Sequence, residues 1–379
     1  MQQSFQHVRV CAVTLTVPAT FIDIDDELAF FDHNPKKLAR AKKIIGFGRR
    51  HIVPQGVTAQ DLCFDAAKRL IEKTSTNPSS IDTLLLVNQS PDYLHPQGAC
   101  ILQHKLGLSK ECVAFDLPMG CAGYVYGLYM AHCLITAGSK RVLLLAGDTP
   151  STHSRLENRR VNPLFGDAGS ATLLEWVDDE QKAFFDLGCD GSGWQNLAIP
   201  AGGARLPITH EILEDTITDN AGNPWNLTEA LIVGHPVYEF SIQTVPRSIQ
   251  NVLHLSGKTI SDIDFIALHQ ANRQILAEIA ARLNLKPEKI PSHTFSHFGN
   301  QSTASVVGVI CHELAHKMIN RELDILLCGF GVGYSWASAI LHFKNCHNLG
   351  ISFLQTQTEQ INREELIEFW KKSFLGENF

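Results

Sequence analysis

The chain has 379 residues, of which 44% are hydrophobic and 19% are charged, and this globular composition excludes a disordered protein. The formal net charge of −7 argues against a general nucleic-acid binder, because phosphate contacts need clustered lysine and arginine. No apolar run approaches the roughly 20 residues that span a bilayer, and no signal-peptide pattern is evident. With ten cysteines and no CxxC pair, we expect reduced thiols and a cytoplasmic protein.

The first half of the chain is predicted to alternate between strands and helices. The evidence is the spacing of apolar residues, which is alternating or unbroken in strands and helical in helices. Along the chain it predicts a strand at 8–17, a helix at 61–73, a strand at 82–88, a helix at 97–107, and strands at 141–146 and 170–176. Continuous apolar strands between helices are typical of an α/β protein with a buried parallel or mixed sheet.

Cys121 stands between a strand-like run at 113–117 and a helical pattern from about 122 to 137. At a helix N-terminus, unpaired backbone N–H groups and the helix dipole favour the thiolate over the thiol. The thiolate is the nucleophile in acyl transfer, although a cysteine taken at random is more often a buried core residue. The position therefore predicts a nucleophile, and its chemistry needs partners from elsewhere in the chain.

The second half begins with a segment at 190–235 that is rich in glycine, proline and polar residues, which is typical of a lid or pocket wall. Beyond it the pattern predicts, in order, a helix at 238–255, a strand at 263–268 ending at His269, a helix to about 283, a turn at 293–300 ending at Asn300, a helix at about 303–318, and a hairpin at 324–343. This order of elements is similar to that at 80–176, so we expect two structurally related halves.

The expected halves give domain boundaries at 1–178 and 179–345, followed by a tail at 346–379. In the tail, the apolar side chains that share one helical face are Leu366, Phe369, Trp370 and Phe374. We expect a C-terminal helical extension that docks on its own chain, with a partner-binding helix as the alternative.

Cys121, His269 and Asn300 each stand at or just before a predicted helix start, which exposes side chains at strand ends in one cleft. The stretches around them read GCAGYVYGL, IALHQANRQIL and HFGNQSTASV. They resemble the active-site motifs of the β-ketoacyl-acyl-carrier-protein synthase III family of condensing enzymes, over about residues 40–343. The resemblance implies a thiolase-like α/β fold, with two similar halves in a layered α-β-α-β-α arrangement, and a homodimer.

The resemblance also implies a role for each residue. Cys121 would take an acyl group from a thioester, with the backbone N–H groups of Cys121 and Val332 as the oxyanion hole. His269 and Asn300 would donate hydrogen bonds to a malonyl-type thioester, and the enolate formed on loss of CO₂ would attack the acyl-cysteine. The substrates would be acyl-CoA or acyl-carrier-protein thioesters, and neither a metal nor another cofactor is expected.

The sequence departs from the family pattern around the reactive residues. Members that prime from acyl-CoA usually have tryptophan and arginine near the position of Lys42 and Lys43, where this chain reads LARAKKIIGF. We expect Lys42, Lys43, Arg155 and Arg273 to contact the carrier protein or CoA. His95 replaces a phenylalanine that is common in the neighbouring subunit's acyl pocket. These departures favour a specialised pathway of lipid or secondary metabolism over the initiation of fatty-acid synthesis.

Three other interpretations compete with the condensing enzyme. An HExxH string at 312–316 could place His312 and His316 on one helical face for Zn²⁺, but the apolar stripe puts both on the opposite, solvated face and the metzincin continuation fails. The complete Cys–His–Asn set argues against an inactive subunit. A non-condensing acyltransferase, which would pass the cysteine-bound acyl group to an amine, hydroxyl or thiol, stays open.

Overall fold

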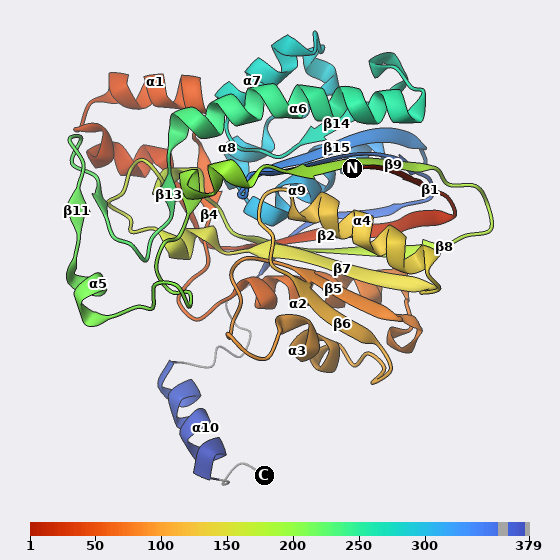
Figure 1. The fold of residues 1–379 in the computed structure, drawn as a ribbon, viewed down its shortest axis with the longest axis horizontal. Helices are drawn as coiled ribbons and strands as arrows, with labels where there is room; N and C mark the ends of the chain where they lie inside the picture. The colour runs from red at the N-terminus through yellow and green to blue at the C-terminus, as the bar shows by residue number, and fades with distance from the viewer. Residues whose placement is uncertain (355–362, 376–379) are drawn as a thin grey trace.

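The computed structural model describes residues 1–354 and 363–375, and two β-sheets form its centre (Figure 1). One sheet has the strand order β17-β2-β8-β7-β5-β6. In that order its strands are His347–Leu354, Val8–Pro18, Ala168–Trp176, Arg141–Asp148, Thr83–Val87 and Val113–Leu117. The other sheet has the order β1-β9-β16-β15-β14, formed by Gln2–Phe5, Ala183–Cys189, Ser335–Phe343, Leu323–Gly331 and Phe265–Leu268.

Helices lie between the sheets and on both outer faces. α4 (Gly123–Thr136) and α9 (Ser305–Glu313) contact strands of both sheets, and their side chains are buried nearly all round, as expected of a helix in a central layer. α2 (Ala59–Thr74) and α3 (Gly98–Lys105) cover the six-stranded sheet, and α6 (Gly234–Ser256) and α7 (Arg273–Arg282) cover the five-stranded sheet. This is the predicted thiolase-like α-β-α-β-α layering (Figure 1).

The two halves repeat one arrangement of strands. In the first half, β2 pairs antiparallel with β8, β8 antiparallel with β7, and β7 parallel with β5. In the second half, β9, β16, β15 and β14 repeat the same three pairings in the same order. β1 of the first half pairs with β9 of the second half, and β17, which follows the second half, pairs with β2 of the first half.

The expected helical extension from residue 346 is wrong for 347–354, which form β17. This segment pairs parallel with β2, whose free edge offers backbone partners, and Arg69 of α2 donates to the carbonyls of Leu349 and Gly350. Downstream, α10 (Arg363–Leu375) is helical and stands apart from the sheets in Figure 1. Its Trp370 ring packs edge-on against Tyr93, with the centroids 5.6 Å apart.

The predicted helix at 303–318 is shorter than expected, because α9 ends at Glu313. The Glu313 carboxylate accepts hydrogen bonds from the backbone N–H groups of residues 292–294, at the start of the short helix α8 (Thr294–Phe298) that leads to Asn300. A separate 3₁₀ turn, Ala315–Lys317, follows. His312 and His316 therefore do not share one α-helix, and His312 is half-buried against the Phe298 ring rather than solvated.

Among residues 1–354 and 363–375, no helix combines the length and apolarity needed to cross a membrane.

Candidate active site

A cavity of about 360 Å³ brings together Cys121, His269 and Asn300. It lies at the carboxyl ends of several strands, because Cys121 follows β6, His269 follows β14, and Gly331 is the last residue of β15. Part of its wall comes from the irregular segment at 190–235, through the short strands β10 (Leu197–Ala198) and β13 (Leu231–Ile232). The predicted pocket wall is therefore observed, and side chains from both halves face one space.

Cys121 lies two residues before the first residue of α4 and is only 7% exposed. The backbone N–H groups of Val332 and of Cys121 itself, and the Ser302 side chain, act on its Sγ. All three contacts lower the thiol pKa, but burial has the larger effect and raises that pKa to about 11. The expectation of a resting thiolate is therefore wrong, because desolvation outweighs the hydrogen bonds.

Gly331 allows the turn after β15 to approach the nucleophile. A Cβ built on Gly331 would lie 2.6 Å from the Cβ and 2.7 Å from the Sγ of Cys121, which is closer than real carbon contacts. The backbone of the Gly331–Val332 turn can therefore reach Sγ only because residue 331 has no side chain.

His269 is fixed at the end of β14 by its backbone N–H, which donates to the Cys328 carbonyl at 2.8 Å. Its ring packs edge-on against Phe330, and burial lowers its pKa to about 3, so the imidazole is neutral at pH 7. Nδ1 is buried with no hydrogen-bond partner among the described residues. Since a buried N–H without an acceptor is rarer than an unpaired acceptor, the proton is favoured on Nε2, which can donate into the cavity.

Asn300 is held on both sides. Its backbone N–H donates to the Leu164 carbonyl at 2.8 Å, and its carbonyl accepts from the Gly166 N–H at 3.1 Å. Its side-chain Oδ1 accepts a hydrogen bond of 3.0 Å from the Ser302 backbone N–H. That contact fixes the orientation of the amide, so the Nδ2 hydrogens are available to a group in the cavity that Asn300 lines.

Asp148, at the end of β7, is a site residue that the sequence reasoning missed. It is fully buried, and its carboxylate accepts hydrogen bonds from the Gln89 backbone N–H at 2.6 Å and from the hydroxyls of Ser302 and Thr303 at 2.6 and 2.5 Å. The position directly after a buried strand was the available signal. Asp148 thereby joins the turn after β5 to the turn after Asn300.

The four cations expected at a carrier or CoA contact do not all meet. Arg273 donates to the backbone carbonyls of Lys42 and Lys43 at 3.4 Å each, so α7 brings these residues beside α1 (Pro35–Ile45). Lys43 and Arg273 line a shallow depression there, while the Lys42 ammonium pairs with an aspartate at 2.7 Å. Arg155 lies elsewhere and binds Glu229, with its Nε 2.6 Å from the carboxylate.

Comparisons with known proteins agree with this geometry. Residues 115–191 match the profile of "3-Oxoacyl-[acyl-carrier-protein (ACP)] synthase III", and residues 253–343 match that of its "C terminal" domain. A Campylobacter jejuni protein, whose name assigns it provisionally as a 3-oxoacyl-[acyl-carrier-protein] synthase 3, is 35% identical over 352 residues, covering 93% of this chain and 98% of the relative. A β-ketoacyl-[acyl-carrier-protein] synthase III of Rhodopirellula baltica is 30% identical, covering 89% of this chain and 98% of the relative.

A crystal structure of a 3-oxoacyl-(acyl-carrier protein) synthase from Burkholderia xenovorans LB400 superposes with a TM-score of 0.86. It is 31% identical in sequence, and the alignment covers 93% of this chain and 99% of that one. The fold, the matched profiles and the near-complete coverage of these relatives together show that the chain belongs to the β-ketoacyl-acyl-carrier-protein synthase III family of condensing enzymes.

Proposed function

We propose that this protein condenses a cysteine-bound acyl group with a malonyl thioester, with loss of CO₂. The observation that carries the proposal is the placement of His269 and Asn300 around the cavity that holds Cys121. Both residues present neutral N–H donors to the cavity. Acyl loading of Cys121 alone would not need these two donors, whereas condensation with a malonyl thioester would.

In the loading step, Cys121 Sγ attacks the carbonyl carbon of an acyl thioester. The backbone N–H groups of Cys121 and Val332, which both act on Sγ, are the proposed donors to the oxygen of the tetrahedral intermediate. Collapse of the intermediate breaks the bond to the leaving thiol, which takes the proton that the Cys121 thiol gives up. Because the resting thiol is protonated, this proton leaves as the new C–S bond forms.

In the condensing step, the carbonyl of a malonyl thioester accepts hydrogen bonds from His269 and Asn300. Breaking the bond to the carboxylate releases CO₂ and leaves an electron pair on the α-carbon as an enolate, whose charge develops at that carbonyl oxygen. The enolate attacks the acyl carbonyl on Cys121 and the bond to Sγ breaks, which gives a β-ketoacyl thioester and the Cys121 thiolate. A proton from solvent then restores the resting thiol. Neutral donors suit this step because they stabilise the anion without giving up a proton to it.

The substrates are proposed to be thioesters of acyl carrier protein or coenzyme A, delivered past Lys42, Lys43 and Arg273. The clustering of these residues on α1 and α7 supports that path, and Arg155 is left out of it because it lies elsewhere, bound to Glu229. A specialised pathway remains our proposal, since the departures from the family pattern at Lys42, Lys43 and His95 support it. In this structure His95 is exposed and lies outside the cavity of its own chain.

The protein is proposed to act as a homodimer. β6 ends the six-stranded sheet, and Val113 at its start is 56% exposed, so the strand has an edge that a second copy can cover. Light scattering at micromolar concentration should report twice the chain mass, and a monomer would contradict this part of the proposal.

The reaction is tested by mass spectrometry of the protein with a panel of acyl-CoA and acyl-carrier donors, each with and without malonyl thioester. One acyl mass per chain should appear, should be absent from Cys121→Ala, and should be lost with release of CO₂ and a ketoacyl product when malonyl thioester is added. If acyl-Cys121 forms but is discharged only by an amine, hydroxyl or thiol without CO₂, the non-condensing acyltransferase replaces this proposal.

A further inference from the structure

The cavity has two chemically different ends. One end is formed by Ala271, Asn272 and Ile275 of the second half, and the residues between them in the chain, Arg273 and Gln274, line the depression between α1 and α7. The other end is formed by the turns after β5 and β7 in the first half. If thioesters enter past the cations, as the proposed function states, the acyl chain on Cys121 extends toward the second end.

The lining from these two turns is mostly polar, with Gln89, Ser90, Asp148 and His153 beside Pro150. Other segments add apolar side chains to the same cavity, such as Phe165 and Leu197. His153 is anchored by its carbonyl, which accepts a hydrogen bond of 2.8 Å from the Ala230 N–H, so its position is tied to the wall segment. A plain alkyl chain would gain nothing from a hydroxyl and an imidazole at this place.

Ser90 and His153 have unused hydrogen-bonding capacity. The Ser90 hydroxyl oxygen lies 3.4 Å from His153 Nε2 and 3.4 Å from Asp148 Oδ1, and both contacts are long for hydrogen bonds that involve a hydroxyl. The same oxygen accepts from the Thr149 backbone N–H at 3.3 Å. A substrate atom can therefore form shorter bonds with the Ser90–His153 pair than the pair forms within itself.

The charges around the pair select against ionic groups. Asp148 is fully buried behind Ser90, and it accepts hydrogen bonds from neutral backbone and hydroxyl donors. Burial lowers the pKa of His153, which keeps the imidazole neutral. The described residues that line the cavity include no lysine or arginine, so a carboxylate on the acyl chain would meet Asp148 without a counter-charge.

We infer that the acyl group carried by Cys121 has an uncharged hydrogen-bonding substituent, a hydroxyl or an amide, which Ser90 and His153 recognise. This inference rests on the proposed function and specifies its acyl donor. His153 is the specificity-determining residue, because its neutral ring can donate from one nitrogen and accept at the other.

The test measures how fast Cys121 is acylated by pantetheine thioesters of matched size: butyryl, 3-hydroxybutyryl, 4-hydroxybutyryl and succinyl. At least one hydroxyacyl donor should load faster than butyryl by at least about fivefold, the discrimination that roughly one net hydrogen bond gives. Succinyl should load more slowly than either hydroxyacyl donor. In His153→Leu and in Ser90→Ala the hydroxyacyl-to-butyryl ratio should fall to near one.

Ser241→Ala is the matched control, because Ser241 also lines the cavity but its hydroxyl donates within α6 to the Val237 carbonyl at 2.7 Å. It should keep the parental ratio, and since each ratio is internal to one variant, a partly unfolded sample does not distort it. Faster loading of butyryl or succinyl in the parent protein overturns the inference alone. A ratio unchanged in both His153→Leu and Ser90→Ala also overturns it, while failure of every donor to acylate Cys121 overturns the proposed function as well.

Discussion

The buried carboxylate of Asp148 accepts a 2.6 Å hydrogen bond from the hydroxyl of Ser302, and the same side chain lowers the pKa of the Cys121 thiol. The backbone N–H of Ser302 also donates to the Oδ1 of Asn300 at 3.0 Å. Ser302 thus connects the nucleophile, the buried carboxylate and the proposed enolate donor. The negative charge of Asp148 also acts on Cys121, because it raises the pKa of the thiol that burial has already raised.

Alkylation of Cys121 should therefore respond to pH as a buried thiol does. Because the pKa of Cys121 is raised to about 11, the fraction of thiolate should still be rising steeply above pH about 9, where an ordinary cysteine levels off. The rate of iodoacetamide modification of Cys121, followed by peptide mass spectrometry from pH about 6 to 10, measures this. A plateau that begins below pH about 8 would contradict the assigned environment.

Asp148→Asn should lower the pKa of Cys121, since it removes the nearby negative charge that raises that pKa. The alkylation profile of the variant should shift to lower pH than the parental profile. The variant should also be less stable by about 1–3 kcal/mol, because an amide cannot accept from every donor that the carboxylate satisfies. Denaturant unfolding measures the second effect.

Asp116→Asn is the control for the charge effect. Asp116 also lies near the end of a strand, but its carboxylate accepts from the Gly98 and Ala99 N–H groups at the start of α3. It should cost stability without moving the alkylation profile of Cys121. An equal shift in both variants would show that the profile reports general loosening rather than the charge of Asp148.

Gly331→Ala should slow acyl loading at Cys121 by about 10²–10³. The new methyl group would sit 2.7 Å from Sγ, so the turn that carries the Val332 N–H has to move away. Losing one oxyanion donor of this kind costs about 10²–10³ in rate. In Gly234→Ala, by contrast, the added Cβ would meet no atom within 4 Å, and loading should be unchanged. Parental loading by Gly331→Ala would remove Val332 from the oxyanion hole.

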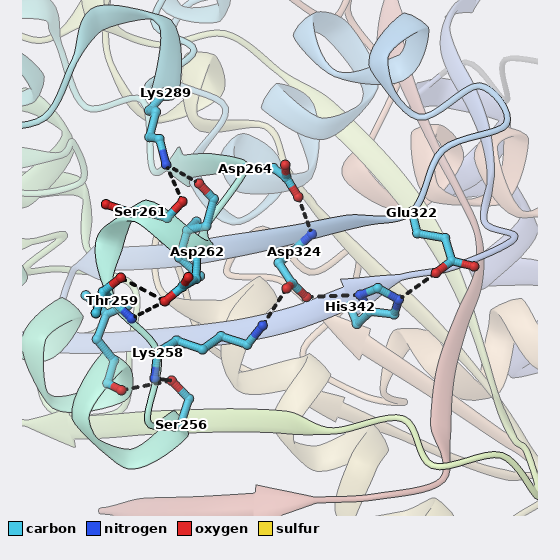
Figure 2. A network of polar contacts seen from close by, with 12 residues as sticks. Ser256, Lys258, Thr259, Ser261, Asp262, Asp264, Lys289, Glu322, Asp324 and His342 are labelled. Carbon is cyan, nitrogen blue, oxygen red and sulfur yellow. Dashed lines mark hydrogen bonds and ion pairs between the residues drawn. The ribbon is translucent and has the colours of Figure 1, made fainter.

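A polar network away from the cavity should make stability depend on pH (Figure 2). His342 Nδ1 lies 3.0 Å from Asp324 Oδ1. The hydrogen bond with Asp324 raises the pKa of His342, and this effect is larger than the lowering of that pKa by burial. A raised folded-state pKa adds stability that is fully present below the unfolded value of about 6.5 and is lost as pH rises through the folded value.

His342→Gln should therefore lower the free energy of unfolding more at about pH 5.5 than at about pH 9. The difference should stay below about 1 kcal/mol, because the His342 side chain is 32% exposed and solvent screens the pair. Urea unfolding at both pH values measures it. In an Asp324→Asn background most of the difference should vanish, and a difference that survives unchanged would assign it to other groups.

The sequence predicted one cleft for Cys121, His269 and Asn300 because each stands at or just before a predicted helix start, and for Cys121 and His269 that position follows a strand. That logic needs only local patterns and the rule that parallel strands end together. The same rule applies to Asp148, the last residue of β7. The sequence does not show, however, whether the partners of this carboxylate are a cation, a metal or hydroxyl groups. The answer depends on Ser302 and Thr303, which lie more than 150 residues away in the chain.

Other features depended on packing that no local pattern specifies. The helix N-terminus predicted a thiolate at Cys121, but burial raises the pKa of the thiol and keeps it protonated. The degree of that burial depends on the residues of the whole cavity. Residues 347–354 follow a break after β16, and only the free edge of β2 makes them a strand. Likewise α9 ends at Glu313, whose carboxylate serves the N–H groups of another turn. His153 was also missed, since a histidine in a polar loop gives no sign of which cavity it lines.

The most direct test of the central claim separates the two half-reactions in Asn300→Ala. Loading of Cys121 needs the nucleophile and the oxyanion hole, whereas decarboxylation also needs donors at a second carbonyl. The Ser302 N–H already occupies Asn300 Oδ1, so the amide N–H groups of Asn300 are available to that carbonyl. The variant should acylate Cys121 at near the parental rate, yet release CO₂ and form ketoacyl product about 10²–10³ times more slowly. Parental rates of CO₂ release by Asn300→Ala, or a parent protein that loads acyl groups but releases no CO₂ from any malonyl thioester, would contradict the condensing assignment.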